Sequence, residues 1–592
     1  MTGPASAQVP RDTARAPRDS APAVRDTLTV ADSSALPKPD TIEAPFTRSP
    51  SPPDMGIGEP YRWDRESLFA SGALTLLDLL EHVPGLTGFR SGSIASPMFG
   101  AFLGDIGRVR VFYDGLEMAT LDHRTGGLLD LGEVQLWTLE QVAIERGADE
   151  LRIFLRSWRV VRNSPYTRTD VMTGDLETNV YRGFFGRRFQ NGLGLQLAGQ
   201  QYGYGESGLR SSDAGGDQLA LVARLGWARG IWSVDGYAIR ATRTRDRQER
   251  EQGNGDFIAR LRATRTDAYL RAGVGDPERG AWLQALAANA DFTEKTPFTP
   301  PRDSADTTRS ETQFVASAGF TRWGFRLSAE DRVLSRSGTT RSAISGRASL
   351  DRRLLGVSLY AEYGTGGSTS SEEAQLRLTP LSFLSLAGAV ARRHGGANDS
   401  GRDVLSSRGE VAVRVGRAWL SGGVLVREGD SLPAPRVYDS TYVNALSGKG
   451  TGNFVAIRGK VWNDIGLDGF AVRWSEESFY RPRTQSRAEI FINTKWLRRF
   501  PKGNFGFLGS MAHEYRSATP FPRAVADGSP VAAEFSTHSH ALISRMEITI
   551  LDAVIFWQQR FWLAPRGQAD IVPGFVFPQQ FNLYGVRWTF WN

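Results

Sequence analysis

The feature that most constrains this chain is the way its apolar residues are distributed. None of the 592 residues lies in a run that approaches the roughly 18 apolar residues of a membrane-spanning helix. From about residue 165 to the end, strand-length segments instead alternate apolar side chains with polar or small ones, as Tyr584, Val586 and Trp588 do with the residues between them. Such alternation gives a strand one face for lipid and one for a lumen. The sequence therefore predicts a transmembrane β-barrel over residues 161–592.

The connections between these segments indicate how the barrel is threaded. About 22 segments follow one another, an even number that places both ends of the barrel on one side of the membrane. Short connections alternate with longer polar ones, which is the asymmetry expected between periplasmic turns and outside loops. The short ones lie at 190–192, 229–230, 323–324, 352–355, 416–417 and 501–504, and the long ones at 203–217, 241–265, 293–311, 394–408, 427–452 and 515–538.

Composition supports a barrel over the alternative of several soluble domains. Aromatic residues make up 10% of the chain, glycine is abundant at 64 residues, and mean hydropathy is only -0.32, as expected when an apolar face is built by alternation. A soluble β-propeller would repeat a motif at a fixed period, and no such repeat is present. The absence of cysteine excludes disulfides, thiolate metal sites and cysteine nucleophiles.

The net charge of +7 comes almost entirely from arginine. A nucleic-acid-binding surface would gather these cations into one patch, whereas here they are spread along the whole chain. Positions in a barrel lumen, or facing lipopolysaccharide, explain this spread better. We therefore expect outer-membrane lipid, and not nucleic acid, as a partner.

The N-terminal region differs from the rest. Ala5-Ser6-Ala7 has the small residues that end a signal peptide, so residues 1–7 are interpreted as the remnant of one. Residues 8–60 are rich in Pro, Asp, Ala, Ser and Thr and show no hydrophobic period, which predicts a disordered tether. Two short extended islands, 26–31 and 40–42, interrupt it.

Residues 61–160 predict a small α+β unit. Apolar residues recur at helical spacing over 74–83, and Pro84-Gly85 ends that pattern. Residues 108–113 then read as a strand that closes on the tight turn Asp114-Gly115. A short helical turn over 136–139 and a strand over 141–145 complete the unit.

Three stretches of this unit resemble the plug domain of the TonB-dependent receptors. Residues 76–85 resemble the first helix of the plug, residues 109–117 are similar to its central strand and turn, and residues 139–147 resemble its closing helix and strand. The resemblance implies a plugged barrel in the bacterial outer membrane. The plug residues that carry it are Pro84, Gly85, Asp114, Gly115, Glu145, Arg146 and Gly147.

The island in the tether resembles the TonB box of this family, the strip that pairs with an energy-transducing protein in the periplasm. Its residues are Asp26, Thr27, Leu28, Thr29, Val30 and Ala31. The resemblance implies that a small ligand binds the outside loops and the plug apex, and that the TonB complex pulls the tether to open a path. The ligand classes it leaves open are siderophores, cobalamin, glycans and peptides.

Two departures from the family pattern motivate an alternative. Residues 148–158 replace the Pro and Gly-rich strand that usually follows the Arg-Gly pair, and the outside loops are modest for a receptor of a large ligand. The alternative is a plugged barrel without energy coupling that serves as a structural, adhesive or surface-assembly component.

No catalytic or metal-binding constellation is expected, so the chain is predicted to be neither an enzyme nor dependent on a cofactor. His538 and His540 lack a visible third ligand, and His513 reads as isolated. The charges crowded into 243–251 are expected to form a solvated loop face. No nucleophile elbow, phosphate loop or calcium loop is present.

Overall fold

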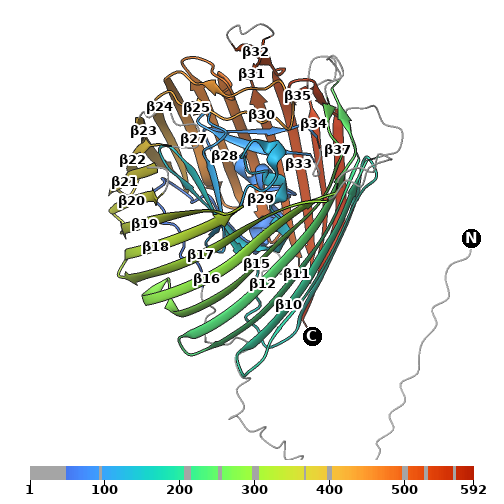
Figure 1. Ribbon diagram of the computed structural model, residues 1–592, viewed down its shortest axis with the longest axis vertical. Helices are drawn as coiled ribbons and strands as arrows, with labels where there is room; N and C mark the ends of the chain where they lie inside the picture. The colour runs from blue at the N-terminus through green and yellow to red at the C-terminus, as the bar shows by residue number, and fades with distance from the viewer. Residues whose placement is uncertain are drawn as a thin grey trace, which may run out of the picture. The chain divides into compact units, whose positions relative to one another are not determined.

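The computed structural model shows a closed β-barrel whose lumen is occupied by an N-terminal plug (Figure 1). None of the helices in the described part of the chain is long and apolar enough to cross a membrane. The structure describes residues 48–92, 96–205, 215–250, 257–295, 306–365, 369–395, 403–496, 505–525, 531–563 and 569–591.

The barrel contains 22 antiparallel strands, as the sequence predicted. Consecutive strands pair around the wall, and the last strand closes it against the first with Val586 opposite Val171. The strands are β8 (Tyr166–Gly174), β9 (Thr178–Arg188), β10 (Leu193–Tyr204), β11 (Gly216–Arg229), β12 (Trp232–Arg245), β15 (Leu261–Asp276), β16 (Arg279–Glu294), β17 (Thr307–Arg322), β18 (Phe325–Arg336), β19 (Thr339–Asp351), β20 (Leu355–Thr365), β21 (Thr369–Leu381), β22 (Leu384–His394), β23 (Asp403–Val415), β24 (Ala418–Arg427), β27 (Gly450–Trp462), β28 (Ile465–Trp474), β29 (Thr484–Thr494), β30 (Phe505–Arg516), β33 (Ser539–Ile550), β34 (Ala553–Trp562) and β37 (Gln580–Trp591).

The alternation along these strands sorts their side chains between the two faces of the wall. Tyr584, Val586 and Trp588 of β37 are 51%, 40% and 51% exposed on the outer surface, whereas Arg587 between them is buried in the lumen. Because apolar side chains occupy the outer face and arginines the inner one, this strand has the alternation expected of a membrane barrel.

One end of the barrel, the turn side, carries tight connections such as 230–231, 323–324 and 416–417. The other end, the loop side, carries the long connections 428–449 and 517–538. The loop side also has short connections at 175–177 and 337–338, so the length asymmetry expected from the sequence does not hold at every hairpin.

The loop-side connections contain small two-stranded sheets of their own, each formed by a segment folding back on itself. Their strands are β13 (Gln248–Glu249) with β14 (Phe257–Ile258), β25 (Ser431–Leu432) with β26 (Ala445–Leu446), β31 (Pro520–Arg523) with β32 (Ala532–Phe535), and β35 (Ala569–Val572) with β36 (Phe575–Phe577).

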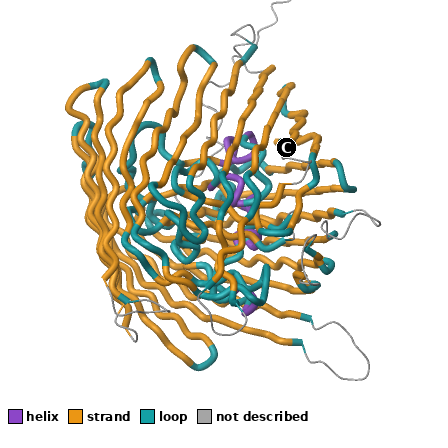
Figure 2. The backbone as a smooth tube through the Cα atoms, turned by 90° about the horizontal axis from the view of Figure 1, so that it is seen from above, coloured by secondary structure: helices purple, strands orange, loops and turns teal. Residues whose placement is uncertain are grey.

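The plug is an α+β unit built on a five-stranded sheet in the order β1-β6-β7-β4-β5. A separate hairpin, β2 with β3, extends from it, and the helices and loops of the plug lie inside the ring of barrel strands (Figure 2). Its elements are β1 (Arg62–Asp64), α1 (Arg65–Ala70), α2 (Leu76–Leu80), β2 (Leu86–Arg90), β3 (Met98–Phe102), β4 (Val109–Tyr113), β5 (Leu116–Glu117), the 3-10 turns His123–Thr125, Leu131–Glu133 and Leu136–Thr138, β6 (Leu139–Arg146) and β7 (Leu151–Ser157).

The helix of the plug is shorter than its apolar pattern predicted. Apolar residues recur over 74–83, but α2 ends at Leu80, because a residue that precedes proline is disfavoured in the helical conformation. Gly85 follows with a φ of 87°, a left-handed conformation that suits glycine. A Cβ at Gly85 would also lie 2.8 Å from the side chain of Leu103, so this position requires glycine for two reasons.

The segment that departs from the family pattern forms the middle strand of the plug sheet. Strand β7 lies between β6 and β4, antiparallel to the first and parallel to the second. Leu151, Ile153 and Leu155 of β7 are buried in the plug core. The stretch 109–117, which resembles the central strand of the family, therefore lies next to the centre of this sheet, and β7 occupies the centre.

Residues 48–60 were expected to belong to the tether, but they lie against the turn side of the barrel wall. The side chain of Gln284 donates to the carbonyl oxygen of Arg48 at 2.7 Å, and Arg377 donates to that of Asp54 at 3.0 Å. Pro52 and Pro53 lack backbone N–H groups, so this segment cannot form a regular sheet ladder, and barrel side chains bind its carbonyl groups instead. Residues 48–60 therefore belong to the folded part of the chain.

Candidate functional site

The turn predicted at Asp114-Gly115 forms, and it contacts both the rest of the plug and the barrel wall. Asp114 and Gly115 have φ angles of 50° and 90°, the left-handed pair that a tight hairpin turn between β4 and β5 requires. The Asp114 carboxylate accepts hydrogen bonds from the Ser157 backbone N–H at 3.1 Å and from the Tyr269 hydroxyl at 2.8 Å. Tyr269 belongs to the barrel, so the turn is tied directly to the wall.

Arginines surround this carboxylate. Arg224 of the barrel lies 3.4 Å from it, Arg159 lies 3.8 Å away, and Arg271 donates to the Asp114 carbonyl oxygen. Burial alone would raise the pKa of Asp114, but these three guanidinium groups hold it well below its usual range. The carboxylate is therefore ionised at neutral pH and fixes the turn against the wall electrostatically.

The same arrangement recurs around the plug, where acidic side chains face arginines that project from the barrel strands. The pairs of a plug acid with a wall arginine include Asp105–Arg427, Glu117–Arg332, Asp130–Arg243, Glu133–Arg265, Glu145–Arg347 and Asp149–Arg393. Other pairs have the opposite sense, with arginine on the plug, among them Arg110–Glu362, Arg124–Glu294, Arg146–Glu410 and Arg152–Glu373. The lumen arginines expected from the sequence thus have a specific role, because they bind the plug.

The closing motif Glu145-Arg146-Gly147 contributes to this interface at the end of β6. Glu145 accepts two hydrogen bonds from Arg347, at 2.5 and 2.8 Å, and Arg146 donates to Glu410 at 2.8 Å. A Cβ at Gly147 would lie 2.7 Å from the Glu150 carbonyl oxygen, so the chain can turn into β7 here only without a side chain. Pro84 and Gly85, in contrast, shape the entry to β2 and take no part in the charge pairs.

The plug apex, which was expected to be open to a ligand, is covered by the loop-side connections. Phe89 and Phe99 of the β2-β3 hairpin are 0% and 1% exposed. The ring of Phe89 lies 5.1 Å from that of Phe521, and Phe99 lies 5.4 Å from Tyr438. We call this group the mouth cluster; its buried members are Phe89, Phe99, Ala101, Ile106, Leu128, Ile258, Leu432, Ala434, Tyr438, Tyr442, Tyr480, Phe521, Ala541, Trp562, Ala569, Ile571, Val572 and Phe575.

Polar contacts hold the mouth cluster closed. The hydroxyl of Tyr438 donates to the carbonyl oxygens of Phe89 at 3.1 Å and Pro97 at 2.8 Å. Arg250 pairs with Asp439 at 2.5 Å and also contacts Glu534, which joins three separate loop-side connections. The expectation that the charges of 243–251 form a solvated face is therefore wrong for Arg250, which is 8% exposed. The carboxylates that pair with this arginine come from loops distant in the sequence, so they could not be identified from its neighbours in the chain.

The tyrosines of the mouth cluster were not predicted from the sequence. Tyr438, Tyr442 and Tyr480 are all fully buried, although the first two lie in the connection 427–452, which was predicted to be a polar outside loop. The available signal was their chemistry, since a solvated loop rarely needs several aromatic side chains.

The histidines come closer together than expected. His513 of β30 is not isolated, because its Nε2 lies 3.4 Å from Nδ1 of His540 on the paired strand β33. The ring of His538 lies a further 6.3 Å from that of His540. Among the described residues, no group of three His, Cys, Asp or Glu side chains has a geometry that could hold a metal ion. The candidate TonB box, residues 26–31, and the island 40–42 lie outside the described residues.

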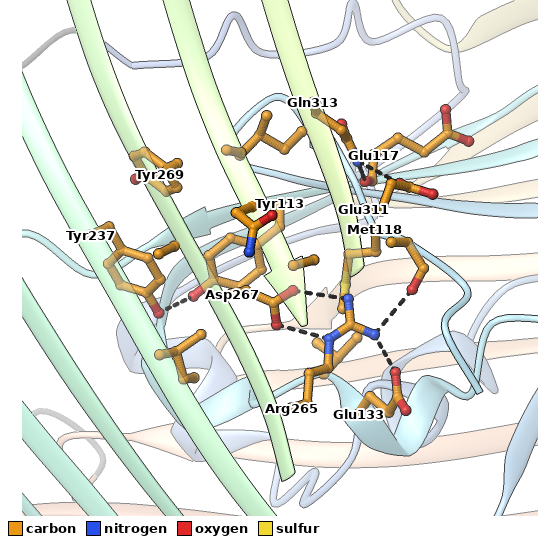
Figure 3. A pocket seen from close by; sticks show the side chains of 18 of the residues that line it. Tyr113, Glu117, Met118, Glu133, Tyr237, Arg265, Asp267, Tyr269, Glu311 and Gln313 are labelled. Atoms are coloured by element: carbon orange, nitrogen blue, oxygen red, sulfur yellow. Dashed lines mark hydrogen bonds and ion pairs between the residues drawn. The ribbon is translucent and has the colours of Figure 1, made fainter. Parts of the chain in front are cut away.

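A small cavity lies between the plug and the wall of β12, β15, β16 and β17 (Figure 3). Met118 of the plug and Tyr237 and Tyr269 of the wall line it, and the hydroxyl of Tyr113 of the plug lies 2.6 Å from that of Tyr237. On the turn side, a wider space opens between the N-terminal part of the plug and β29, β30, β33, β34 and β37. The plug therefore fills much of the lumen and leaves a wide space toward the turn side.

Comparison with known proteins rests on structure. No family model matches the sequence, and no curated protein matches it. Many solved structures are similar over most of their length, and three of them serve as examples. They are the siderophore receptor PirA from Acinetobacter baumannii (TM-score 0.65, 10% identity, 89% of this chain and 98% of that one), a mutant of the ferric enterobactin receptor PfeA from Pseudomonas aeruginosa (0.65, 9%, 89% and 98%) and the FrpB iron transporter from Neisseria meningitidis (0.64, 8%, 88% and 97%).

Sequence identities of 8 to 10% show a shared fold and do not identify a ligand. The likeness covers both parts of the molecule, the closed wall of 22 strands and the plug within it. The chain therefore has the fold of the TonB-dependent outer-membrane receptors.

Proposed function

We propose that this chain is an outer-membrane receptor that takes up a scarce nutrient with energy supplied by a TonB complex. The observation that carries the proposal is a lumen closed twice, by the plug and by the mouth cluster above it. A barrel closed in this way does not act as a passive pore, so passage of a ligand requires a rearrangement.

The charge pairs explain why that rearrangement needs external work. Removing one partner from a buried ion pair costs about 3–5 kcal/mol, because the other charge is left uncompensated. Moving the plug away from the wall would separate pairs such as Glu145–Arg347 and Asp149–Arg393 together. Thermal motion alone rarely supplies such energy, whereas force applied through the N-terminal tether does.

The ligand is proposed only as a class. The similar structures are described as a siderophore receptor, a ferric enterobactin receptor and an iron transporter, so an iron–siderophore complex is the first candidate to test. Cobalamin, glycans and peptides remain the other candidates.

The deciding experiment tests the candidate TonB box. Residues Asp26–Ala31 would add as a strand to a TonB sheet, an interaction that depends mainly on backbone donors and acceptors. Leu28→Pro or Val30→Pro should therefore abolish uptake, because proline removes an N–H, while ligand binding and barrel assembly persist. Thr29→Ala is the matched control and should leave uptake nearly unchanged.

A cross-linking version needs no known ligand. Leu28→Cys places a single thiol in a chain that has no cysteine, so a disulfide to cysteine variants of TonB would be unambiguous. A disulfide formed only through Thr41→Cys would move the box to the island 40–42. If neither position cross-links while the barrel is assembled, the uncoupled structural or surface-assembly role becomes the better explanation.

A further inference from the structure

The cavity between plug and wall is large enough for more than solvent. Its volume is about 70 Å³, several times the roughly 10–15 Å³ that one water molecule needs. It is also far too small for a macrocyclic or peptide ligand. While the plug remains inside the barrel, the cavity can hold only a molecule about the size of a single ring.

The walls of the cavity are mostly apolar. Small side chains line the barrel side, where Ala241, Ala288 and Ala290 leave space that larger residues would fill. Leu116 and Val134 of the plug close the opposite side. Ligand sites have this composition, an apolar lining with a few placed polar groups that set orientation.

The charged groups at the edge of the cavity satisfy one another. Arg265 donates to Asp267 at 2.8 and 3.0 Å and also to Glu133 (Figure 3). The guanidinium is therefore neutralised by two carboxylates. An anionic ligand would find no free counter-ion here, because the arginine of the lining is already paired, so the site favours an uncharged ligand over an anionic one.

One polar group in the lining is unsatisfied. Gln313 of β17 is 5% exposed, and its amide nitrogen donates to the Glu117 carbonyl oxygen at 2.6 Å and to Glu311 at 3.1 Å. Its amide oxygen Oε1 has no hydrogen-bond partner. A buried acceptor without a donor is costly, so a donor carried by a ligand would be bound favourably.

We propose that this cavity binds a small, uncharged molecule that consists of a single ring with one hydroxyl donor. The ring would lie against Tyr237 and Tyr269, and the hydroxyl would donate to the amide oxygen of Gln313. Tyr237 and Tyr269 stack with ring centroids 5.4 Å apart and form an aromatic wall. The inference rests on the proposed function, because it places a small-ligand subsite between plug and wall on the path that uptake would use.

The test is a titration of the full-length protein, in detergent micelles, with phenol as the probe. The chain has seven methionines, and Met118 lines the cavity, so ¹³C-methyl methionine labelling reports on it directly. Phenol should shift the Met118 methyl resonance saturably, and Met118→Leu should remove that resonance and so assign it. Absence of a saturable shift in the intact protein would overturn the proposal.

Three comparisons make the result specific. Toluene should bind more weakly than phenol by roughly 2- to 10-fold, the effect of one hydrogen bond, and benzoate should not bind. Ala288→Phe fills the cavity and should weaken phenol binding at least about tenfold. Ala287→Phe is the matched control, because the neighbouring residue faces outward. Equal binding of benzoate, or equal binding to both phenylalanine variants, would show that phenol partitions elsewhere.

The outcome is independent of energy coupling. Saturable phenol binding without any cross-link to TonB would keep the subsite and reject the proposed uptake mechanism. A cross-link to TonB without phenol binding would reject the subsite and leave the proposed uptake mechanism in place.

Discussion

At the residue scale, a single turn shows how backbone conformation and electrostatics act together. Asp114 is required first by geometry, since a tight turn with positive φ favours Asp or Asn followed by Gly. Its carboxylate is then required by charge, because Arg224, Arg159 and Arg271 converge on it. Asparagine would satisfy the first requirement and not the second.

Asp114→Asn should therefore weaken plug docking without disturbing the turn. Loss of the charge leaves three buried arginines with one carboxylate fewer, although Asp235 still pairs with Arg159 and Arg224. We therefore expect a cost below the roughly 3–5 kcal/mol of a fully unpaired buried charge at pH 7, measured as faster proteolysis of the plug in an intact barrel. The pKa of Asp114 is lower in the folded plug than the value near 3.9 of an unfolded chain. Its contribution is therefore present above about pH 4 and is lost as the pH falls through the folded pKa.

The pH dependence provides the check on this explanation. The difference between Asp114→Asn and the unaltered protein should shrink steadily as the pH falls from about 4 toward the lowered pKa of folded Asp114, because over this range the unfolded chain binds a proton that the folded plug does not. A difference that stays constant from pH 7 to pH 3 would mean that the carboxylate acts through its shape and not its charge.

At the element scale, the loop-side connections act as structural elements of their own. The segments around Tyr438, Tyr480 and Phe521 bury their aromatic rings against the plug hairpin, and Arg250 links them. The mouth is thus closed by contacts between loops that are far apart in sequence.

Arg250→Ala should loosen the mouth cluster. Ser91 lies at the plug apex and is 1% exposed, so Ser91→Cys should resist a charged maleimide when the mouth is closed. Adding Arg250→Ala should make that thiol react several-fold faster. Leu446→Cys, at a position that is 74% exposed, is the control and should react quickly in both backgrounds. Equal reactivity of Ser91→Cys with and without Arg250 would show that this arginine does not control access.

The alternation of β37 leads to a second element-scale prediction. Val586 faces outward, and an arginine at this position should cost about 2–4 kcal/mol if it lies near the bilayer midplane. Arg587 is a poor control, because it pairs with Glu547 at 2.6 Å and binds the Phe69 carbonyl oxygen. Thr589→Arg is a better one, since Thr589 lines the wide turn-side space. Barrel assembly can be monitored by heat-modifiable gel mobility. Assembly should fail or slow for Val586→Arg and should proceed normally for Thr589→Arg.

At the scale of the whole molecule, the two ends of the barrel differ. The long connections and the closed mouth lie at one end, and the tight turns lie at the other together with the segment 48–60. In an outer-membrane receptor the first end faces outside and the second faces the periplasm.

Epitope tags test this orientation. A tag inserted between Gly448 and Lys449 should bind antibody on intact cells, because both residues are exposed on the loop side. A tag in the turn Gly416-Arg417 should bind only after the outer membrane is permeabilised. The reverse result would invert the topology and place the mouth cluster in the periplasm.

The barrel and the outline of the plug can be predicted from local sequence patterns. Period-2 alternation sorts side chains between lipid and lumen strand by strand, so residues such as Val586 and Arg587 could be placed without knowing their neighbours. The turn at Asp114-Gly115 was equally local, because its conformation depends on the two residues themselves. Both features are encoded by residues close together in the chain.

The contacts between those elements, in contrast, could not be predicted from local patterns. Glu145 and Arg347, or Tyr438 and Phe89, are separated by hundreds of residues, and local pattern carries no information about such pairs. The same holds for β7, whose place at the centre of the plug sheet depends on pairing with β4 and β6. The closed mouth, the bound plug and the cavity beside Gln313 arise from long-range charge pairing and packing, which only the folded chain brings together.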